Sequence, residues 1–137
     1  MRIAVLFGGT SEERDVSIAS GAQTVLALEA AGHDVVALDT IRGVLGPADR
    51  ARLPSSGIAP TPPVDDDRAL ARRPAASVLT RTSELREVDL VFVALHGGSG
   101  EDGTLQALLD PRTGPAHLAI LVVPGHTAPY TRRAARP

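Results

Sequence analysis

Residues 3–9 read Ile3-Ala4-Val5-Leu6-Phe7-Gly8-Gly9, a run of apolar side chains that two glycines bring to an end. An apolar run without alternation that stops at glycine predicts a short strand buried on both faces. Such strands belong to parallel sheets with helices on both faces. This stretch therefore favours an α/β domain.

The next residues predict a helix and then a second strand. Residues 10–15 are polar, and from Val16 to Ala31 the apolar residues recur three or four positions apart. Gly32 is placed to end that helix, and residues 34–39 predict the second strand. Together these elements form a βαβ unit with a right-handed crossover. Its predicted buried helix face consists of Val16, Ala19, Ala22, Gln23, Leu26 and Ala30.

A third buried strand is predicted at residues 90–95, and a glycine-rich loop and a helix over residues 104–109 follow it. Prolines punctuate residues 41–75, which are expected to be loop. A short helix at residues 83–87 and a strand at 118–123 are also expected. We expect one domain over residues 1–110, with a variable region at 41–80, and a divergent, poorly ordered tail at 111–137.

Composition excludes several classes of protein. The net charge is −2, and no basic stripe is present in the first hundred residues, so nucleic-acid binding is not expected. There is no Cys, which excludes disulfides and thiolate chemistry. The apolar run at residues 3–7 is too short for a signal peptide or a membrane span. We expect a cytoplasmic protein that does not bind membranes.

The predicted strands place two loops, residues 8–15 and 96–103, at one edge of the sheet. Ligands bind at the carboxyl edge of open parallel sheets. There, Glu13 could pair with an ammonium group and His96 could donate to a carboxylate. Two plainer interpretations stay open: Thr10 and Glu13 fit a capping box, and His96 fits a structural role. The acidic run at residues 65–67 suggests a cation site or simply a solvated loop.

The residues that form these loops resemble a known family. Residues 3–17, together with 21–22 and 31–35, are similar to the opening of D-alanine–D-alanine ligases, and residues 89–106 resemble the second signature of that family. The likeness covers residues 1 to about 40 and 88 to about 110. It implies a Rossmann-like pre-ATP-grasp domain with three or four parallel strands and flanking helices.

The resemblance also implies an activity and its site residues. Such ligases join two D-alanines for peptidoglycan precursor synthesis, using ATP and Mg²⁺ to form an acyl phosphate that the second amine attacks. By resemblance, Glu13 is the catalytic carboxylate that holds the ammonium of the first D-alanine, and Ser17 caps the helix or shapes the pocket floor. His96 lies beside that D-alanine, and Glu101 orients the imidazole. Pairing as a homodimer is a further implication.

The likeness stops where nucleotide chemistry would begin. All 14 basic residues are Arg, and the sequence has neither Lys nor Asn, so ATP and Mg²⁺ sites of the family's type are absent from this chain. We expect the chain alone to be inactive, and the tail from residue 111 to be foreign to the family through a shifted reading frame. A short paralogue, a non-catalytic amino-acid-binding or regulatory module, and a fragment of a D-alanine–D-lactate ligase are the alternatives.

Overall fold

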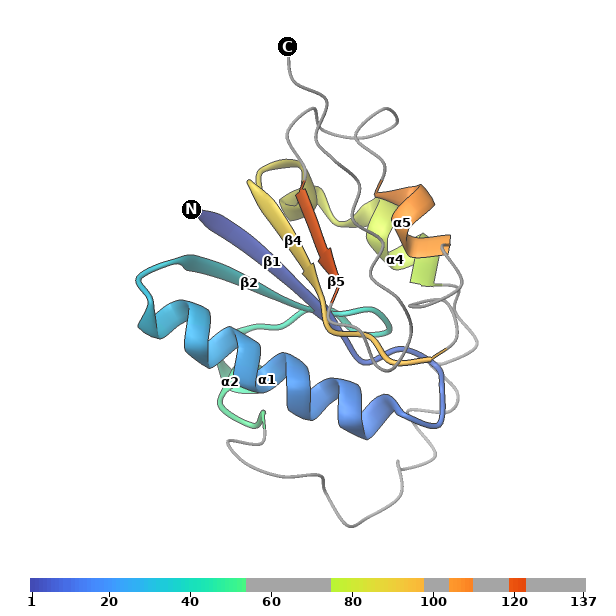
Figure 1. Ribbon diagram of the computed structural model, residues 1–137, viewed down its shortest axis with the longest axis horizontal. Coiled ribbons are helices and arrows are strands. Elements are labelled where there is room, and N and C mark those ends of the chain that lie inside the picture. Colours follow the sequence, from blue (N-terminus) through green and yellow to red (C-terminus); the bar gives the residue numbers. More distant parts are fainter. Residues whose placement is uncertain (54–74, 98–103, 110–118, 123–137) are drawn as a thin grey trace.

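A five-stranded sheet with the strand order β3-β2-β1-β4-β5 forms the centre of the protein (Figure 1). The structure is a computed structural model that describes residues 1–53, 75–97, 104–109 and 119–122. The central strand, β1, pairs in parallel with β2 and β4, and β4 pairs in parallel with β5. The strands are β1 (Arg2–Phe7), β2 (Asp34–Asp39), β3 (Gly43–Val44), β4 (Leu90–Val93) and β5 (Ala119–Val122).

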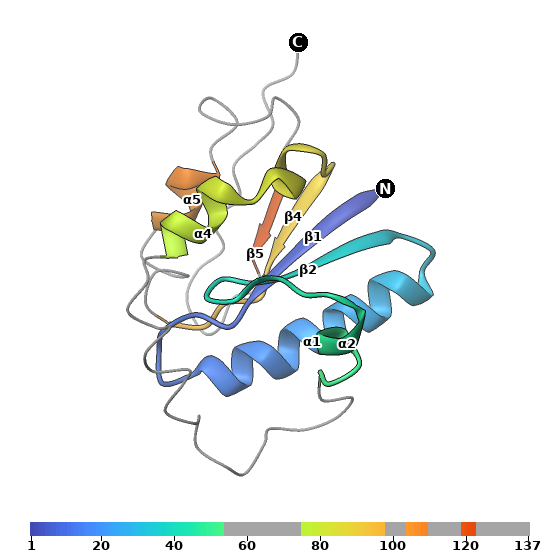
Figure 2. The ribbon, with the colours of Figure 1, turned by 180° about the vertical axis from the view of Figure 1, so that it is seen from behind.

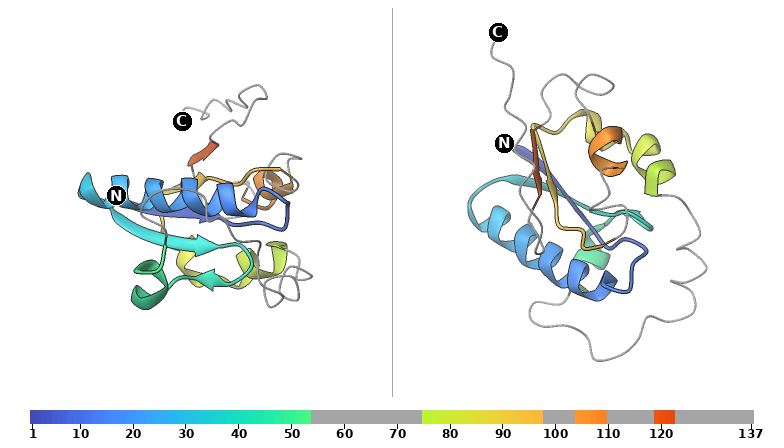
Figure 3. Two further views of the ribbon diagram at one scale, coloured as in Figure 1. Left: turned by 90° about the horizontal axis from the view of Figure 1, so that it is seen from below. Right: turned by 45° about the vertical axis from the view of Figure 1, so that its right-hand side comes forward.

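Helices cover both faces of this sheet, so the α/β class is confirmed. The long helix α1 lies along one face, and α4 and α5 lie on the other, as Figures 2 and 3 show. Three or four parallel strands were expected, and the described sheet has four. The helices are α1 (Arg14–Ala30), α2 (Pro47–Arg50), α4 (Ala75–Arg81), the 3-10 turn η1 (Ser83–Arg86) and α5 (Thr104–Leu108).

Alternate side chains of β1 supply two separate cores. Val5 and Phe7 pack with Val25 of α1, whereas Ala4 and Leu6 pack with side chains from α4, η1 and α5. Every β1 residue from Ile3 to Phe7 is buried. A strand with two buried faces needs apolar residues at consecutive positions, which is why the run at residues 3–7 shows no alternation.

The predicted helix 16–31 exists, but its first residue and most of its buried face were wrong. It begins two residues earlier, at Arg14, and ends at Ala30. Two members of the predicted buried face, Val16 and Leu26, are 36% and 52% exposed. The face that meets the sheet consists of Arg14, Ser17, Gly21, Ala22 and Val25.

Close packing of α1 on β1 explains this difference. A Cβ atom on Gly21 would lie 2.5 Å from both Cβ and Cγ of Phe7. Only glycine allows α1 to lie this close to Phe7 of β1. A pattern that counts hydrophobic side chains does not count glycine, so it missed this face of the helix. The predicted end of the helix is confirmed, since Gly32 adopts a φ of +84° and His33 N–H donates to the Leu28 carbonyl, as in a Schellman turn.

The remaining expectations meet the structure unevenly. The short helix at 83–87 is η1, the helix at 104–109 is α5, and the strand at 118–123 is β5. The stretch 41–75 was expected to be loop, yet it contains the short elements β3 and α2. Residues 54–74 and most of the tail lie outside the described residues, so the domain boundaries stay predictions.

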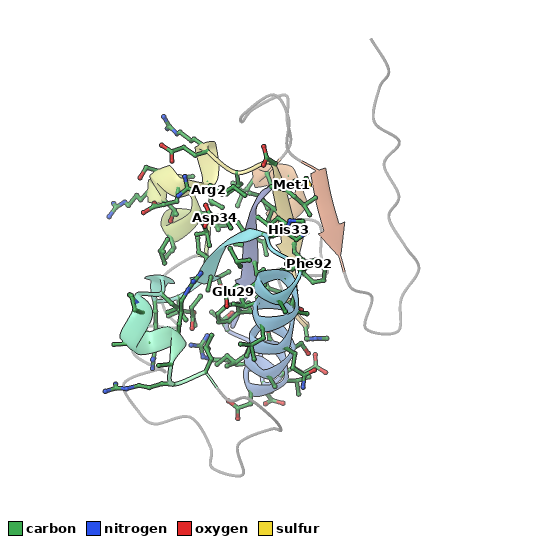
Figure 4. All side chains as sticks on the ribbon, turned by 90° about the vertical axis from the view of Figure 1, so that its left-hand side faces the viewer. Met1, Arg2, Glu29, His33, Asp34 and Phe92 are labelled. Atoms are coloured by element: carbon green, nitrogen blue, oxygen red, sulfur yellow. The ribbon has the colours of Figure 1, made fainter. Side chains whose placement is uncertain are left out.

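Ionic contacts close the amino-terminal edge of the sheet (Figure 4). Arg2 Nε lies 3.3 Å from the carboxylate of Asp34, and Arg2 Nη1 lies 2.7 Å from that of Glu87. The Arg2 backbone N–H donates to Asp89 at 2.7 Å. The amino ends of β1, β2 and β4 are thus joined by charged side chains, while the opposite, carboxyl edge carries the glycine loops.

Candidate functional site

Two loops meet at the carboxyl edge of the sheet. We call residues 8–13, between β1 and α1, the β1 loop, and residues 94–97, after β4, the β4 loop. Since β1 and β4 are parallel neighbours, with Leu6 opposite Val93, both loops leave the sheet at the same height. Gly8, Gly9 and Gly97 have φ values of +92°, +83° and +69°, which only glycine adopts at low cost.

Side chains of the β1 loop contact the β4 loop directly. Ser11 Oγ donates a hydrogen bond to the carbonyl oxygen of His96 at 2.7 Å. A Cβ atom on Gly97 would lie 3.0 Å from Glu13 Oε2 and 3.3 Å from Ser11 Oγ. The structure therefore brings Glu13 and the residue after His96 together, and the missing side chain of Gly97 makes room for the carboxylate.

Glu13 does not form the capping box that the sequence allowed. It is itself the N-cap residue of α1, and its side chain makes no capping hydrogen bond. A capping box would need Thr10 as the N-cap, three residues before the observed one. The Glu13 side chain is exposed and directed at Gly97. The capping interpretation is thus wrong, and a ligand-facing carboxylate is compatible with the geometry.

Ser17 joins the ends of the two central strands. Its hydroxyl is fully buried, accepts a hydrogen bond from Gly8 N–H at 2.9 Å, and donates one to the Ala94 carbonyl at 2.6 Å. The expected capping role is not observed, because Ser17 lies four residues after the N-cap. Because the hydroxyl donates one hydrogen bond and accepts another, Ser17 links the ends of β1 and β4 beneath the two loops.

His96 is partly buried, and its ring has an uncommitted nitrogen. Nε2 is inaccessible to solvent and has no hydrogen-bond partner among the described residues. A buried polar atom without a partner is uncommon in folded proteins and indicates a place for a ligand or a water molecule. Glu101, the expected partner of this ring, lies outside the described residues.

A buried ion pair that the sequence did not predict holds the β1 loop from below. Arg14 and Asp39 are 6% and 3% exposed, and Nη2 of Arg14 lies 2.6 Å from Oδ2 of Asp39. A signal was present in the sequence: residue 14 falls at helical spacing with Ser17, Gly21 and Val25 on the buried face. A buried guanidinium needs a partner, and the strand end at residue 39 supplies it.

Metal-ligating side chains do not gather in the part of the chain that the structure describes. Across residues 1–53, 75–97, 104–109 and 119–122, no three His, Asp or Glu side chains gather where they could hold a metal ion. Residues 65–67, the acidic run, lie outside those ranges. Within the same ranges, no helix has the length and apolar content needed to cross a bilayer.

The fold is a doubly wound α/β domain whose two glycine loops lie at its carboxyl edge, the edge where open parallel sheets bind ligands. A family model described as D-ala D-ala ligase N-terminus matches residues 2–115. The chain belongs to this family of D-alanine–D-alanine ligase N-terminal domains, as the resemblance implied. The match extends past residue 110, where the domain was expected to end.

Several relatives are named D-alanine–D-alanine ligase. The protein of Halorhodospira halophila is 38% identical over 109 residues, covering 80% of this chain and 24% of that protein. The protein of Rhodococcus erythropolis is 39% identical over 137 aligned positions, covering 86% of this chain and 36% of that protein. The chain thus spans about a quarter to a third of the length of these relatives.

A solved structure is also similar, the VanG D-Ala:D-Ser ligase of Enterococcus faecalis. Its sequence is 23% identical, the TM-score is 0.43, and the match covers 83% of this chain and 34% of that chain.

Proposed function

We propose that this chain forms the amino-acid side of a D-alanine–D-alanine ligase site, with Glu13 binding the ammonium group of the first D-alanine. The observation that supports this most is the position of Glu13 Oε2, 3.0 Å from where a Cβ of Gly97 would lie. A carboxylate in that position reaches a ligand lodged between the β1 loop and the β4 loop. A charge-assisted hydrogen bond would hold the ammonium group in place, and with further contacts to the carboxylate and the methyl group it would select one enantiomer.

His96 supplies the second contact in this proposal. Its buried, unpartnered Nε2 is suited to donate to the carboxylate of the bound D-alanine. Glu101 would hold the ring in the required orientation, as the family resemblance implies. Ser17 acts one layer below, where its hydrogen bonds to Gly8 and Ala94 keep the two loops at a fixed separation.

Ligation itself needs groups that these 137 residues do not supply. The family resemblance implies ATP and Mg²⁺, yet the sequence has no Lys and no Asn. Among the described residues, no group of His, Asp or Glu side chains is placed to bind a metal ion. We therefore propose that this chain binds D-alanine without turning it over. Action in the cytoplasm, pairing as a homodimer, and no role for nucleic acid or membrane belong to the same proposal.

Calorimetry with D-alanine at millimolar concentrations tests the binding step. We expect wild-type protein to bind D-alanine in preference to L-alanine, and Glu13→Gln to weaken binding about 10- to 100-fold. That range follows from ~1.5–3 kcal/mol for a hydrogen bond to a charged group. Glu12→Gln is the matched control, since Glu12 is the adjacent exposed carboxylate and should leave the affinity unchanged.

Three results would count against the proposal. Equal binding of the two enantiomers would remove the basis for a chiral site. An equal loss of affinity in Glu12→Gln and Glu13→Gln would show that the loss comes from the lower negative charge and not from a specific contact of Glu13. Release of phosphate from ATP in the presence of D-alanine and Mg²⁺ would show that the chain catalyses ligation, contrary to the proposal.

A further inference from the structure

The ion pair between Arg14 and Asp39 lies where three elements of the fold meet. Arg14 is the first residue of α1, Asp39 is the last residue of β2, and Phe7, the last residue of β1, pairs with Asp39 in the sheet. Nη1 and Nη2 of Arg14 donate to Oδ1 and Oδ2 of Asp39 at 3.3 Å and 2.6 Å. This two-pronged contact fixes the guanidinium in direction as well as in distance.

The same arginine closes the β1 loop on itself. Its Nη1 donates to the carbonyl of Gly9 at 3.2 Å, and its backbone N–H donates to the carbonyl of Ser11 at 3.2 Å. Arg14 therefore holds Gly9 through its side chain and Ser11 through its backbone. The residues between Gly9 and Arg14 include Ser11 and Glu13, which are the two that contact the β4 loop.

Asp39 is anchored equally firmly. Its Oδ1 also accepts hydrogen bonds from the N–H groups of Ile41 and Arg42, at 2.8 Å and 3.3 Å. The neighbouring Thr40 accepts a hydrogen bond from Gly9 N–H through its hydroxyl at 3.0 Å. The carboxylate is thus a rigid support, and the loop rests on it through Arg14.

Space above the ion pair is filled by the backbone of the β1 loop. A Cβ atom on Gly8 would lie 2.5 Å from Arg14 Nη1 and 2.8 Å from Asp39 Oδ1. The loop therefore lies directly on the two charged groups, and its height above the sheet depends on their size and position.

We propose that Arg14, supported by Asp39, is a positioning residue that fixes the β1 loop so that Ser11 and Glu13 meet His96 and Gly97. Stability alone is a poor explanation for the pair, because buried ion pairs contribute little to stability relative to apolar replacements. Arg14 Nε also has no partner among the residues described, which adds to the cost of burial. This inference rests on the proposed function, since the loop is positioned to bind D-alanine.

Arg14→Lys is the test variant, because lysine keeps the charge but cannot reach both Asp39 and the Gly9 carbonyl in the geometry of a planar fork. Arg50→Lys is the matched control. Arg50 of α2 pairs at 3.0 Å with Glu29, which lies in the last turn of α1, at the other end of that helix from the β1 loop, and it also donates to the Val35 carbonyl. Two quantities are measured in each protein: the amide resonance of Gly97 without ligand, and the dissociation constant for D-alanine.

We expect Arg14→Lys to shift the Gly97 resonance, although Gly97 does not touch Arg14, and to raise the dissociation constant about tenfold, the equivalent of one hydrogen bond. Arg50→Lys should change neither. A purely stabilising role would lower the melting temperature of Arg14→Lys and leave Gly97 unmoved, which would overturn the inference. Absence of D-alanine binding to wild-type protein would defeat the proposed function alone, because the Gly97 resonance still reports the coupling.

Should Arg14→Lys fail to fold, Asp39→Glu provides the same test, because it keeps both charges and moves the carboxylate by one methylene. A shifted Gly97 resonance in a folded Asp39→Glu protein supports the inference, and an unshifted one contradicts it. Loss of folding in both variants would assign the pair to core stability and would also contradict it.

Discussion

Replacing Gly21 with alanine sets two opposing effects against each other inside α1. The added methyl group would lie 2.5 Å from Cβ and Cγ of Phe7 and 2.7 Å from its Cδ1, whereas real Cβ contacts essentially never fall below 3.0 Å. Cβ of Phe7 is fixed by the backbone of β1, so rotation of the ring does not relieve the contact. The helix has to move away from the sheet.

The two effects differ in size. Overpacking a core typically costs about 1–3 kcal/mol. Alanine in place of glycine inside a helix returns roughly 1 kcal/mol through its higher helix propensity. Since one of the contacted atoms cannot yield, the cost falls in the upper part of its range. We expect Gly21→Ala to lower the free energy of unfolding by about 1–2 kcal/mol.

Urea denaturation followed by circular dichroism measures this change. The matched control is Gln23→Ala, an exposed position two residues along the same helix, where the effect should stay within about 0.5 kcal/mol. If Gly21→Ala proved as stable as wild type or more so, helix propensity would outweigh contact with Phe7. The close approach of α1 to β1 would then be refuted.

Two further substitutions test the supports beneath the loops. Ser17→Ala leaves Gly8 N–H and the Ala94 carbonyl without their partner and should cost about 1–3 kcal/mol, again by urea denaturation; a loss below the error of the method would show that these groups find other partners. Asp39→Ala leaves the guanidinium of Arg14 buried and unpaired and should cost about 3–5 kcal/mol in the same assay. A nearly neutral Asp39→Ala would mean that the arginine turns to solvent at little cost.

Much of the fold could be predicted because burial on both faces leaves a direct trace in sequence. The runs at residues 3–7, 34–39 and 90–95 hold few polar residues, and each contains a parallel strand. The elements β3 and α2 are two and four residues long, too short to show any period. Whether such short elements form depends on tertiary contacts, so the local sequence pattern does not predict them.

The buried face of α1 shows where pattern counting fails. Gly21 is inside because the helix touches the sheet there, and Ser17 is inside because its hydroxyl joins two strand ends. Both residues count as polar or neutral in a hydrophobic pattern. The apolar residues Val16 and Leu26, which defined the predicted face, are turned outwards.

The sequence predicted where the candidate site lies in the fold, but not the contacts that its side chains make. Parallel strands that end in glycine predicted that Glu13 and His96 would lie at one edge, and Glu13 does lie against Gly97. Whether Glu13 would cap the helix or face the β4 loop depended on where α1 begins, a boundary that sequence fixes poorly. The Arg14–Asp39 pair joins residues far apart in the chain, so nothing in a single sequence coupled them.

The central claim is that the β1 loop and the β4 loop bind one amino acid between them. Titration with D-alanine, followed through the amide resonances of Gly9 and Gly97, tests this claim most directly. We expect both resonances to shift along one saturation curve, with L-alanine producing much smaller changes. Shifts confined to one loop, or equal shifts with both enantiomers, would contradict the shared site.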